Sequence, residues 1–242
     1  MPKPLTWPDC RNVRDLGGLT TADGVPIRAG ALIRADSLER LTAEGMAAVR
    51  AAGIVRIVDL RNVDEAEAGL HPFRETAELY RLIPMIDPAR EPERDKSAER
   101  TLADIYRSSL IRNAKSIVDG VAAVADAPDG AVLVHCFAGK DRTGMVVALA
   151  LSVAGVADEQ IAADYAYSDE CLQDWNTTIL ADITDEALRR KALERMSARP
   201  ETMLALLGFA RERFGGAAEY LAAHGMSPSQ LERLRARLRD AE

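Results

Sequence analysis

The part of the sequence best suited to chemistry is a short segment around Cys136 and Arg142. Residues 131–135 are typical of a buried strand, the next few residues form a glycine-containing loop, and residues 143–153 are typical of an apolar helix. Backbone N–H groups of such a loop converge on an anion, and the helix N-terminus adds about half a positive charge. Arg142 lies six residues after Cys136, so its planar guanidinium can fold back over the loop and bind two phosphate oxygens. The spacing predicts a phosphate-sized cradle with a sulfur atom at its floor.

The same positive environment would activate the thiol of Cys136. Cysteines at helix N-termini beside arginine titrate at about 3.5–7.5 instead of about 8.5, so we expect a thiolate that attacks a bound phosphoryl group in line. Thr143 is placed to donate its hydroxyl to this thiolate, and His135 is expected to hydrogen-bond the loop backbone and hold its shape. The predicted phosphate-binding residues are Phe137, Ala138, Gly139, Lys140, Asp141, Arg142 and Thr143.

The segment resembles the His-Cys-x5-Arg-Thr/Ser signature of cysteine-dependent phosphatases. Its full form at residues 135–144, His-Cys-Phe-Ala-Gly-Lys-Asp-Arg-Thr-Gly, is similar to that of the atypical bacterial tyrosine phosphatases. These enzymes act on phosphotyrosine, phosphoserine/threonine and phosphoinositides, and are also called triple-specificity phosphatases. The same family pattern is matched, with Val13 in place of an aromatic residue, by residues 12–18, 32–38, 58–61 and 211–216.

The resemblance implies an α/β fold with a tyrosine-phosphatase-like central sheet flanked by helices and an additional C-terminal helical region covering the site. It also implies a single phosphatase domain over residues 1–242, in which residues 158–200 could act as a helical lid.

Hydrolysis also needs a group that protonates the leaving oxygen and later activates water. The resemblance supports Asp141 as this acid, although an aspartate at the start of a helix is also an ordinary N-cap. Asp59 is a second candidate, because it ends the strand predicted over residues 54–60 and ligands of open α/β sheets bind beyond that edge. Asp87, after the strand predicted over residues 79–84, is a third. The sequence leaves this choice open.

Other positive side chains bear on which phosphate ester is bound. A lysine such as Lys140 is a solvated surface residue by default, but its place in the loop favours contact with a second phosphate or a carboxylate. Its Lys-x-Arg arrangement resembles that of phosphoinositide phosphatases. Arg14, Arg34 and Arg61 could line the same pocket or serve as structural ion-pair partners.

Alternating strand-like and helix-like segments must position this loop. Strands are predicted over residues 30–34, 54–60, 79–84 and 131–135. Helices are predicted over residues 42–52, 97–125 (as one or two), 143–153 and most of the chain beyond 158, ending with 227–240. This alternation predicts a sheet covered by helices. The charged, proline-bearing stretch 87–96 has no periodicity, which indicates a surface loop or a mobile flap beside the site.

Composition limits the partners of this chain. Its 242 residues are 48% hydrophobic and 29% charged, as expected for a globular domain, and no apolar run reaches the roughly 20 residues of a membrane span. A net charge of −7 argues against nucleic acid as a partner. Three distant cysteines argue against a disulfide framework or structural zinc and fit a reducing cytoplasm. The N-terminus does not resemble a signal peptide, although some relatives of the resembled family work outside the cell without a recognisable one.

These features predict a monomeric, cytoplasmic phosphatase that needs no metal and no cofactor. Cys136 is the nucleophile, Arg142 the phosphate clamp and Asp141 the acid, acting on phosphorylated proteins or phosphoinositides. One alternative is a non-catalytic phosphate-binding module, a pseudophosphatase, which would have lost its nucleophile or acid. A sulfurtransferase also holds a cysteine in an amide-lined loop, but the run from Arg142 into a helix argues against it.

Overall fold

The computed structural model describes residues 3–240 and is organised around one mixed sheet of order β1-β2-β3-β6-β4-β5. Its parallel strands are β3 (Leu32–Ala35), β6 (Ala131–His135), β4 (Ile54–Asp59) and β5 (Tyr80–Leu82). Two short antiparallel strands, β1 (Lys3–Pro4) and β2 (Arg14–Asp15), extend the edge beside β3. Because β6 lies between β3 and β4, the loop that follows it emerges at the centre of the carboxyl edge.

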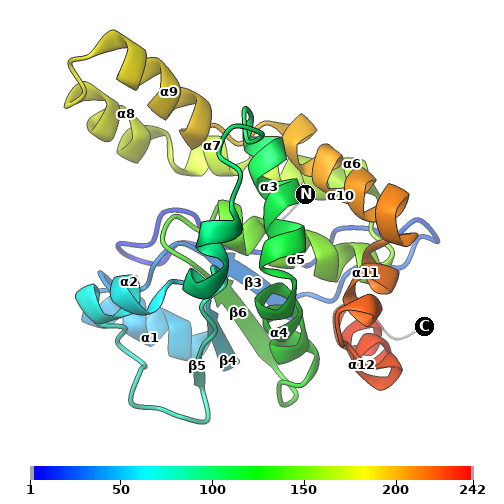
Figure 1. The fold of residues 1–242 in the computed structure, drawn as a ribbon. Coiled ribbons are helices and arrows are strands. Elements are labelled where there is room, and N and C mark those ends of the chain that lie inside the picture. Colours follow the sequence, from blue (N-terminus) through cyan, green and yellow to red (C-terminus); the bar gives the residue numbers. More distant parts are fainter. Residues whose placement is uncertain (1–2, 241–242) are drawn as a thin grey trace.

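Helices cover both faces of this sheet (Figure 1). In chain order they are α1 (Ala43–Ala51), α2 (Val63–Ala68), the 3-10 helix η1 (Pro88–Glu93), α3 (Leu102–Arg112), α4 (Ala114–Ala125), α5 (Asp141–Ala154), α6 (Asp158–Ala166), α7 (Ser168–Cys171), α8 (Gln173–Ala181), α9 (Glu186–Met196), α10 (Pro200–Phe214), α11 (Ala217–Ala223) and α12 (Pro228–Leu238).

The alternation of β6 divides the core into two layers. Val132 and Val134 face a large cluster formed with α3–α6 and α10–α12, whereas Leu133 faces a smaller cluster that contains Val49 of α1 and Trp7. The strand is buried on both faces, which is typical of a central parallel strand.

The predicted fold class is confirmed, and so are the strands of the parallel sheet and the helix capped by Thr42, whose side chain accepts a hydrogen bond from Gly45. Residues 97–125 contain two helices, α3 and α4, which meet at Asn113. Residues 87–96 are not the irregular loop of the prediction, because Asp87 caps the 3-10 helix η1 and Pro88 begins it. The two-residue strands β1 and β2 carry no periodicity that could have predicted them.

The segment 158–200 is not structurally uniform. Helix α6 packs against α5 and α10 and buries Ile161, Ala162 and Tyr165. Only α8 and α9 form a hairpin that projects from the body of the molecule (Figure 1). Within residues 3–240, no helix combines the length and apolarity that crossing a membrane requires.

Candidate active site

The loop between β6 and α5 is held by donors that lie outside it. The backbone N–H of Ser37 donates to the carbonyl of Phe137 at 2.9 Å. The side-chain amide of Asn12 donates to the carbonyl of Ala138 at 2.9 Å. Both contacts pull carbonyl oxygens away from the centre of the loop.

Gly139 continues this pattern at the tightest point of the loop. Nη2 of Arg34 donates to its carbonyl oxygen at 2.7 Å. Its φ is +66°, and a Cβ at this position would lie 2.3 Å from the carbonyl oxygen of Ala35. Glycine is therefore required both for the backbone conformation and for the close approach to β3.

Outward carbonyls turn the loop N–H groups inward, because the two groups of a peptide unit point in opposite directions. Among the residues that the structure describes, none accepts a hydrogen bond from the N–H groups of residues 137–140. These donors converge ahead of α5, whose first turn adds its own N–H groups and dipole. The arrangement leaves inward N–H donors at the place where the sequence predicts an anion cradle.

Arg142 is oriented over the loop by Glu65 of α2. Both terminal nitrogens of the guanidinium bind the Glu65 carboxylate, and Nη1 also lies 3.5 Å from the carbonyl of Leu60. Burial opposes the charge of Arg142, but the hydrogen bonds to Glu65 and the nearby charge of Cys136 raise its pKa. In the described chain, the Nε–H and one Nη2–H have no acceptor. That edge of the guanidinium matches two oxygens of a phosphate.

Asp141 lies beside Arg142 with one carboxylate oxygen fixed. The hydroxyl of Tyr106 donates to Oδ1 at 2.5 Å, and the Tyr165 hydroxyl lies 2.9 Å from that of Tyr106. Since Tyr106 has a single proton to donate, Tyr165 is the donor in the second bond. Burial, together with the charge of Asp141, raises the pKa of Tyr106 well above its usual value, so this hydroxyl stays protonated. Oδ2 of Asp141 remains free for a ligand.

Lys140 points toward the projecting hairpin, and its side chain is buried. Its ammonium donates to the carbonyls of Arg195, Met196 and Ser197 at 2.7, 3.0 and 3.2 Å, and lies 3.3 Å from Oδ1 of Asp141. The charge thus binds the C-terminal end of α9, where helix carbonyls lack partners. The structure gives Lys140 a protein partner in place of the second phosphate expected from the sequence.

Cys136 and Thr143 are both enclosed by the loop and α5. Cys136 is 2% exposed, and the Thr143 hydroxyl is buried without a hydrogen-bond partner in the described residues. The expected bond from Thr143 to the thiol is not formed here, but the unsatisfied hydroxyl remains available to it.

Arg14 and Arg34 lie behind the loop as one buried ionic cluster with Asp164 of α6. Arg14 Nε and Arg34 Nη1 bind the two oxygens of Asp164, each at 2.6 Å. All three side chains are almost fully buried. The two arginines are therefore structural ion-pair partners, which is one of the two roles that the sequence allowed. Because Asp164 fixes Arg34, the hydrogen bond from Arg34 also fixes the carbonyl of Gly139.

Asp59 and Arg61 form a second buried pair. The guanidinium binds both Asp59 oxygens, and the Tyr80 hydroxyl donates to Oδ2 at 2.8 Å. Burial alone would raise the pKa of Asp59, but His135 and the charge of Arg61 hold it well below its usual value. A carboxylate so strongly held in its charged form is poorly suited to protonate a leaving group. Asp87 is also poorly suited to this role, because its carboxylate caps η1.

His135 joins the loop to the Asp59 pair. Its Nδ1 lies 3.1 Å from the carbonyl of Cys136, as expected for a residue that shapes the loop, and its Nε2 lies 3.7 Å from Asp59. His71 stacks on it at 5.1 Å between ring centroids. Nitrogen and oxygen atoms of Asp59, His71 and His135 lie within 4.8 Å of one another, but this is a poor metal site. Arg61 already occupies Asp59, and Nδ1 of His71 accepts the N–H of Phe73, which places the proton on the inward-facing Nε2.

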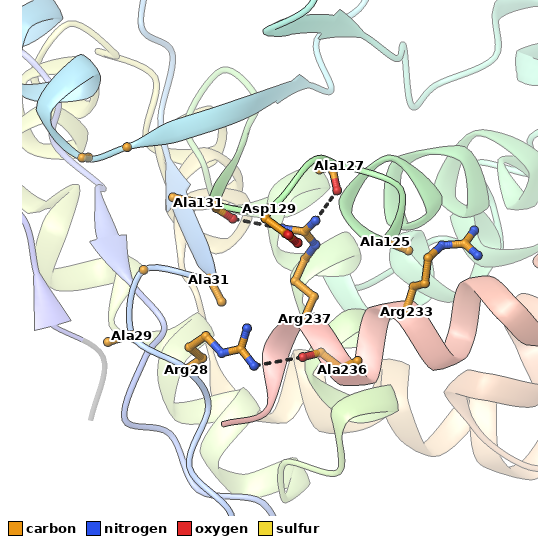
Figure 2. A pocket seen from close by; sticks show the side chains of 14 residues that line it. Arg28, Ala29, Ala31, Ala125, Ala127, Asp129, Ala131, Arg233, Ala236 and Arg237 are labelled. Atoms are coloured by element: carbon orange, nitrogen blue, oxygen red, sulfur yellow. Dashed lines mark hydrogen bonds between the residues drawn. The ribbon is translucent and has the colours of Figure 1, made fainter. Parts of the chain in front are cut away.

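The site opens into a cavity of about 490 Å³ lined by Glu65, Tyr106, Asp141 and Arg142. A second cavity of about 670 Å³ lies at the opposite, amino edge of the sheet, near Gly30 and Gly53. Figure 2 shows that its arginines are already engaged, with Arg28 bound to the carbonyl of Ala236 and Arg237 to that of Ala127. No cysteine lines that second cavity.

Three residues of this site were missed by sequence reasoning. Glu65 carries a local signal, since it forms a capping box with Asn62 at the start of α2. Tyr106 and Asp164 carry none, because they lie far from the loop in sequence and reach it only through the packing of α3 and α6.

Backbone N–H donors, the guanidinium of Arg142 and a cysteine thus lie together at the carboxyl edge of the sheet. A sequence model of the tyrosine phosphatase family matches residues 5–240. The chain belongs to the tyrosine phosphatase family, and it is a protein-tyrosine-phosphatase-type phosphoric monoester hydrolase.

Two relatives illustrate this membership. The triple specificity protein phosphatase PtpB of Mycobacterium tuberculosis is 27% identical, over 94% of this chain and 96% of that protein. A tyrosine-protein phosphatase of Nostoc commune is 29% identical, over 89% of this chain and 76% of its own.

Replacing Glu65 should impair phosphate binding by releasing Arg142. We expect Glu65→Gln to lower kcat/KM about tenfold or more, since a charge-assisted bidentate contact is lost. Steady-state kinetics with p-nitrophenyl phosphate measure the effect. Glu67→Gln on the exposed side of the same helix is the control and should be unaffected. Equal kinetics for the two variants would contradict the role of Glu65.

Replacing Asp164 should destabilise the whole fold. Asp164→Asn leaves two buried guanidinium groups without a counter-charge, and we expect a loss of roughly 3–5 kcal/mol in the free energy of unfolding. Urea denaturation measures it, with exposed Asp182→Asn as the control. A loss below about 1 kcal/mol would contradict the assignment.

The same residue has a predictable effect on pH dependence. Burial would raise the pKa of Asp164, but the charges of Arg34 and Arg14 lower it below its usual value. Its stabilisation is therefore complete above about pH 4, the unfolded value, and is lost as the pH falls. In acid denaturation, Asp164→Asn should lose stability less steeply below pH 4 than the wild type. Parallel curves would exclude this linkage.

Proposed function

We propose that the chain hydrolyses phosphotyrosine in proteins, and phosphoserine/threonine or phosphoinositides as further substrates, through a phosphocysteine intermediate. The observation that carries the proposal is the anion cradle, in which inward N–H groups and the open edge of Arg142 converge beside Cys136. In this proposal residues 1–242 form one phosphatase domain that acts as a monomer and needs no metal or cofactor. Every step uses residues of a single chain.

In the first step, Sγ of Cys136 attacks the phosphorus atom, forming the S–P bond as the P–O bond to the leaving group breaks. The loop N–H groups and Arg142 bind the non-bridging oxygens and stabilise the charge of the transition state. Thr143 lies in the first turn of α5, and its buried hydroxyl has no partner in the described residues. In this proposal that hydroxyl donates a hydrogen bond to the regenerated thiolate.

Asp141 is the general acid of this proposal. Tyr106 fixes its Oδ1, so the free Oδ2 carries the proton that is transferred to the leaving oxygen. The carboxylate then takes a proton from water as the water oxygen attacks phosphorus, breaks the S–P bond and releases inorganic phosphate. Asp59 is the weaker candidate, because Arg61 and Tyr80 saturate its oxygens.

Within residues 158–200, the proposed lid is the α8–α9 hairpin alone. Lys140 holds the end of α9 against the catalytic loop. The hairpin therefore borders the approach to the site, and its displacement would free the Lys140 ammonium for substrate.

The first test is hydrolysis of a phosphotyrosine peptide and a phosphoinositide panel. We expect Cys136→Ser to abolish turnover and Asp141→Asn to slow it about 10²–10⁴-fold, the usual contribution of a general acid. Cys171→Ser and exposed Asp174→Asn are matched controls. Wild-type turnover should persist in EDTA.

The outcomes separate the alternatives. A wild type that binds vanadate but hydrolyses nothing would be a binding module and would sink the enzymatic proposal. A near-normal rate for Asp141→Asn would move the acid elsewhere. The ratio of peptide to lipid turnover decides the substrate class.

Tyr106 should act through Asp141. We expect Tyr106→Phe to lower kcat about tenfold with little change in KM, because the acid loses its fixed orientation while the phosphate cradle is untouched. The effect should shrink for substrates such as 2,4-dinitrophenyl phosphate, whose leaving group needs no proton. An equal loss for good and poor leaving groups would indicate a purely structural role.

A further inference from the structure

A third cavity, larger than the two described above, adjoins the catalytic site. This basic groove, of about 1170 Å³, lies between residues 94–105 on one side and α9 with the start of α10 on the other. In Figure 1 these walls are the stretch leading into α3 and the second helix of the projecting hairpin. The catalytic function does not use the groove.

The groove carries a charge opposite to that of the protein. The whole chain has a net charge of −7, yet the groove is lined by seven basic residues and three acidic ones. The basic residues are Arg94, Lys96, Arg100, Arg190, Lys191, Arg195 and Arg199, and the acidic ones are Glu99, Glu194 and Glu201. The basic residues come from both walls of the groove, so positive charge lies on both sides of the cavity.

Most of these cations lack a counter-charge. Arg94 binds Glu91 and Glu99. In residues 3–240, none of the other six basic side chains has a carboxylate within 4.0 Å. The cavity at the amino edge differs, because its Arg28 and Arg237 are bound to backbone carbonyls (Figure 2) and its Arg233 is bound to Asp126. The groove therefore holds positive charge that is free to meet an external anion.

The groove and the catalytic cavity share a wall. Arg94, Leu102, Ile105 and Arg195 line both. A ligand whose phosphate occupies the cradle can therefore extend directly into the groove, so the anions it meets there belong to the same substrate molecule.

The shape of the groove favours a peptide. Leu102 and Ile105 provide apolar surface, and Thr202 provides a hydroxyl beside the cations, a mixture suited to the main chain and side chains of an extended segment. A bilayer would need one apolar helix face. The exposed leucines of α9, Leu188 and Leu193, are five residues apart and point about 140° away from each other around the helix.

We propose that the basic groove binds acidic residues that flank the phosphorylated residue of a peptide substrate and thereby selects acidic phosphopeptides. The proposal rests on the phosphatase function stated above and specifies its substrate class. The groove residues touch the flanking sequence and not the reacting atoms, so they act on specificity alone.

The test compares two phosphotyrosine peptides, one with Glu and Asp on both sides and one with Gln and Asn at the same positions. Lys191→Glu on α9 and Arg100→Glu on the facing wall are tested singly and together. The matched control is Arg189→Glu, which makes the same kind of charge change on α9 outside the groove lining. p-Nitrophenyl phosphate reports the chemistry without any flanking contact.

We expect the wild type to prefer the acidic peptide about tenfold in kcat/KM at low salt, mainly through KM, and to lose this preference at high salt. The double variant should show no preference, while its turnover of p-nitrophenyl phosphate stays within twofold of the wild type. Arg189→Glu should behave as the wild type.

Equal turnover of the two peptides by the wild type would overturn the proposal, as would a double variant that keeps the preference. Failure of the wild type to hydrolyse p-nitrophenyl phosphate would instead refute the phosphatase function. Stimulation by phosphatidylserine vesicles that is lost in the double variant, with no peptide preference, would assign the groove to a membrane surface and overturn the peptide assignment.

Discussion

The structure of the active site depends on turning four consecutive carbonyl groups away from the centre of one loop. In the described chain, the N–H groups of residues 137–140 make no hydrogen bond within the loop, so most contacts that fix its shape come from elsewhere in the fold. Ser37, Asn12 and Arg34 bind three of the carbonyls, and His135 binds the fourth. The N–H groups turn inward because the carbonyl groups are held in the opposite direction, and in the proposed mechanism this preorganisation stabilises the phosphoryl transition state.

Two buried ion pairs support this arrangement, and they engage the other arginines near the loop. Desolvating a guanidinium is costly unless a carboxylate compensates it. Asp164 compensates Arg14 and Arg34, and Asp59 compensates Arg61. Arg142 differs because Glu65 binds only its terminal edge, so a second anion can still be bound. The number of N–H groups left free, rather than proximity to the loop, separates the clamp from the scaffold.

The sequence was informative where the signal is local and weak where it depends on packing. The strand, loop and helix around Cys136 follow one another in the chain, so their order and the six-residue spacing to Arg142 predicted the cradle. The parallel strands were predicted for the same reason, from short local runs of strand-forming residues such as residues 54–60 after Gly53. Tyr106 and Asp164 could not be found, since they reach the loop only when α3 packs on α10 and α6 packs on α5. The function of Lys140 was likewise unpredictable, because its partners are backbone carbonyls of α9 that have no sequence signature.

The contact between Asn12 and Ala138 joins residues 126 positions apart. Long-range contacts of this kind carry a large loop-closure entropy and form late, after local helices and neighbouring strands. The catalytic loop therefore cannot reach its final shape until residues 3–15 have joined the edge of the sheet. At that edge β1 is exposed, whereas β2 is buried and fixed by the bond from Arg14 to Asp164. An opening that released Asn12 would also have to break this buried ion pair, so the shape of the catalytic loop is as stable as the ionic cluster behind it.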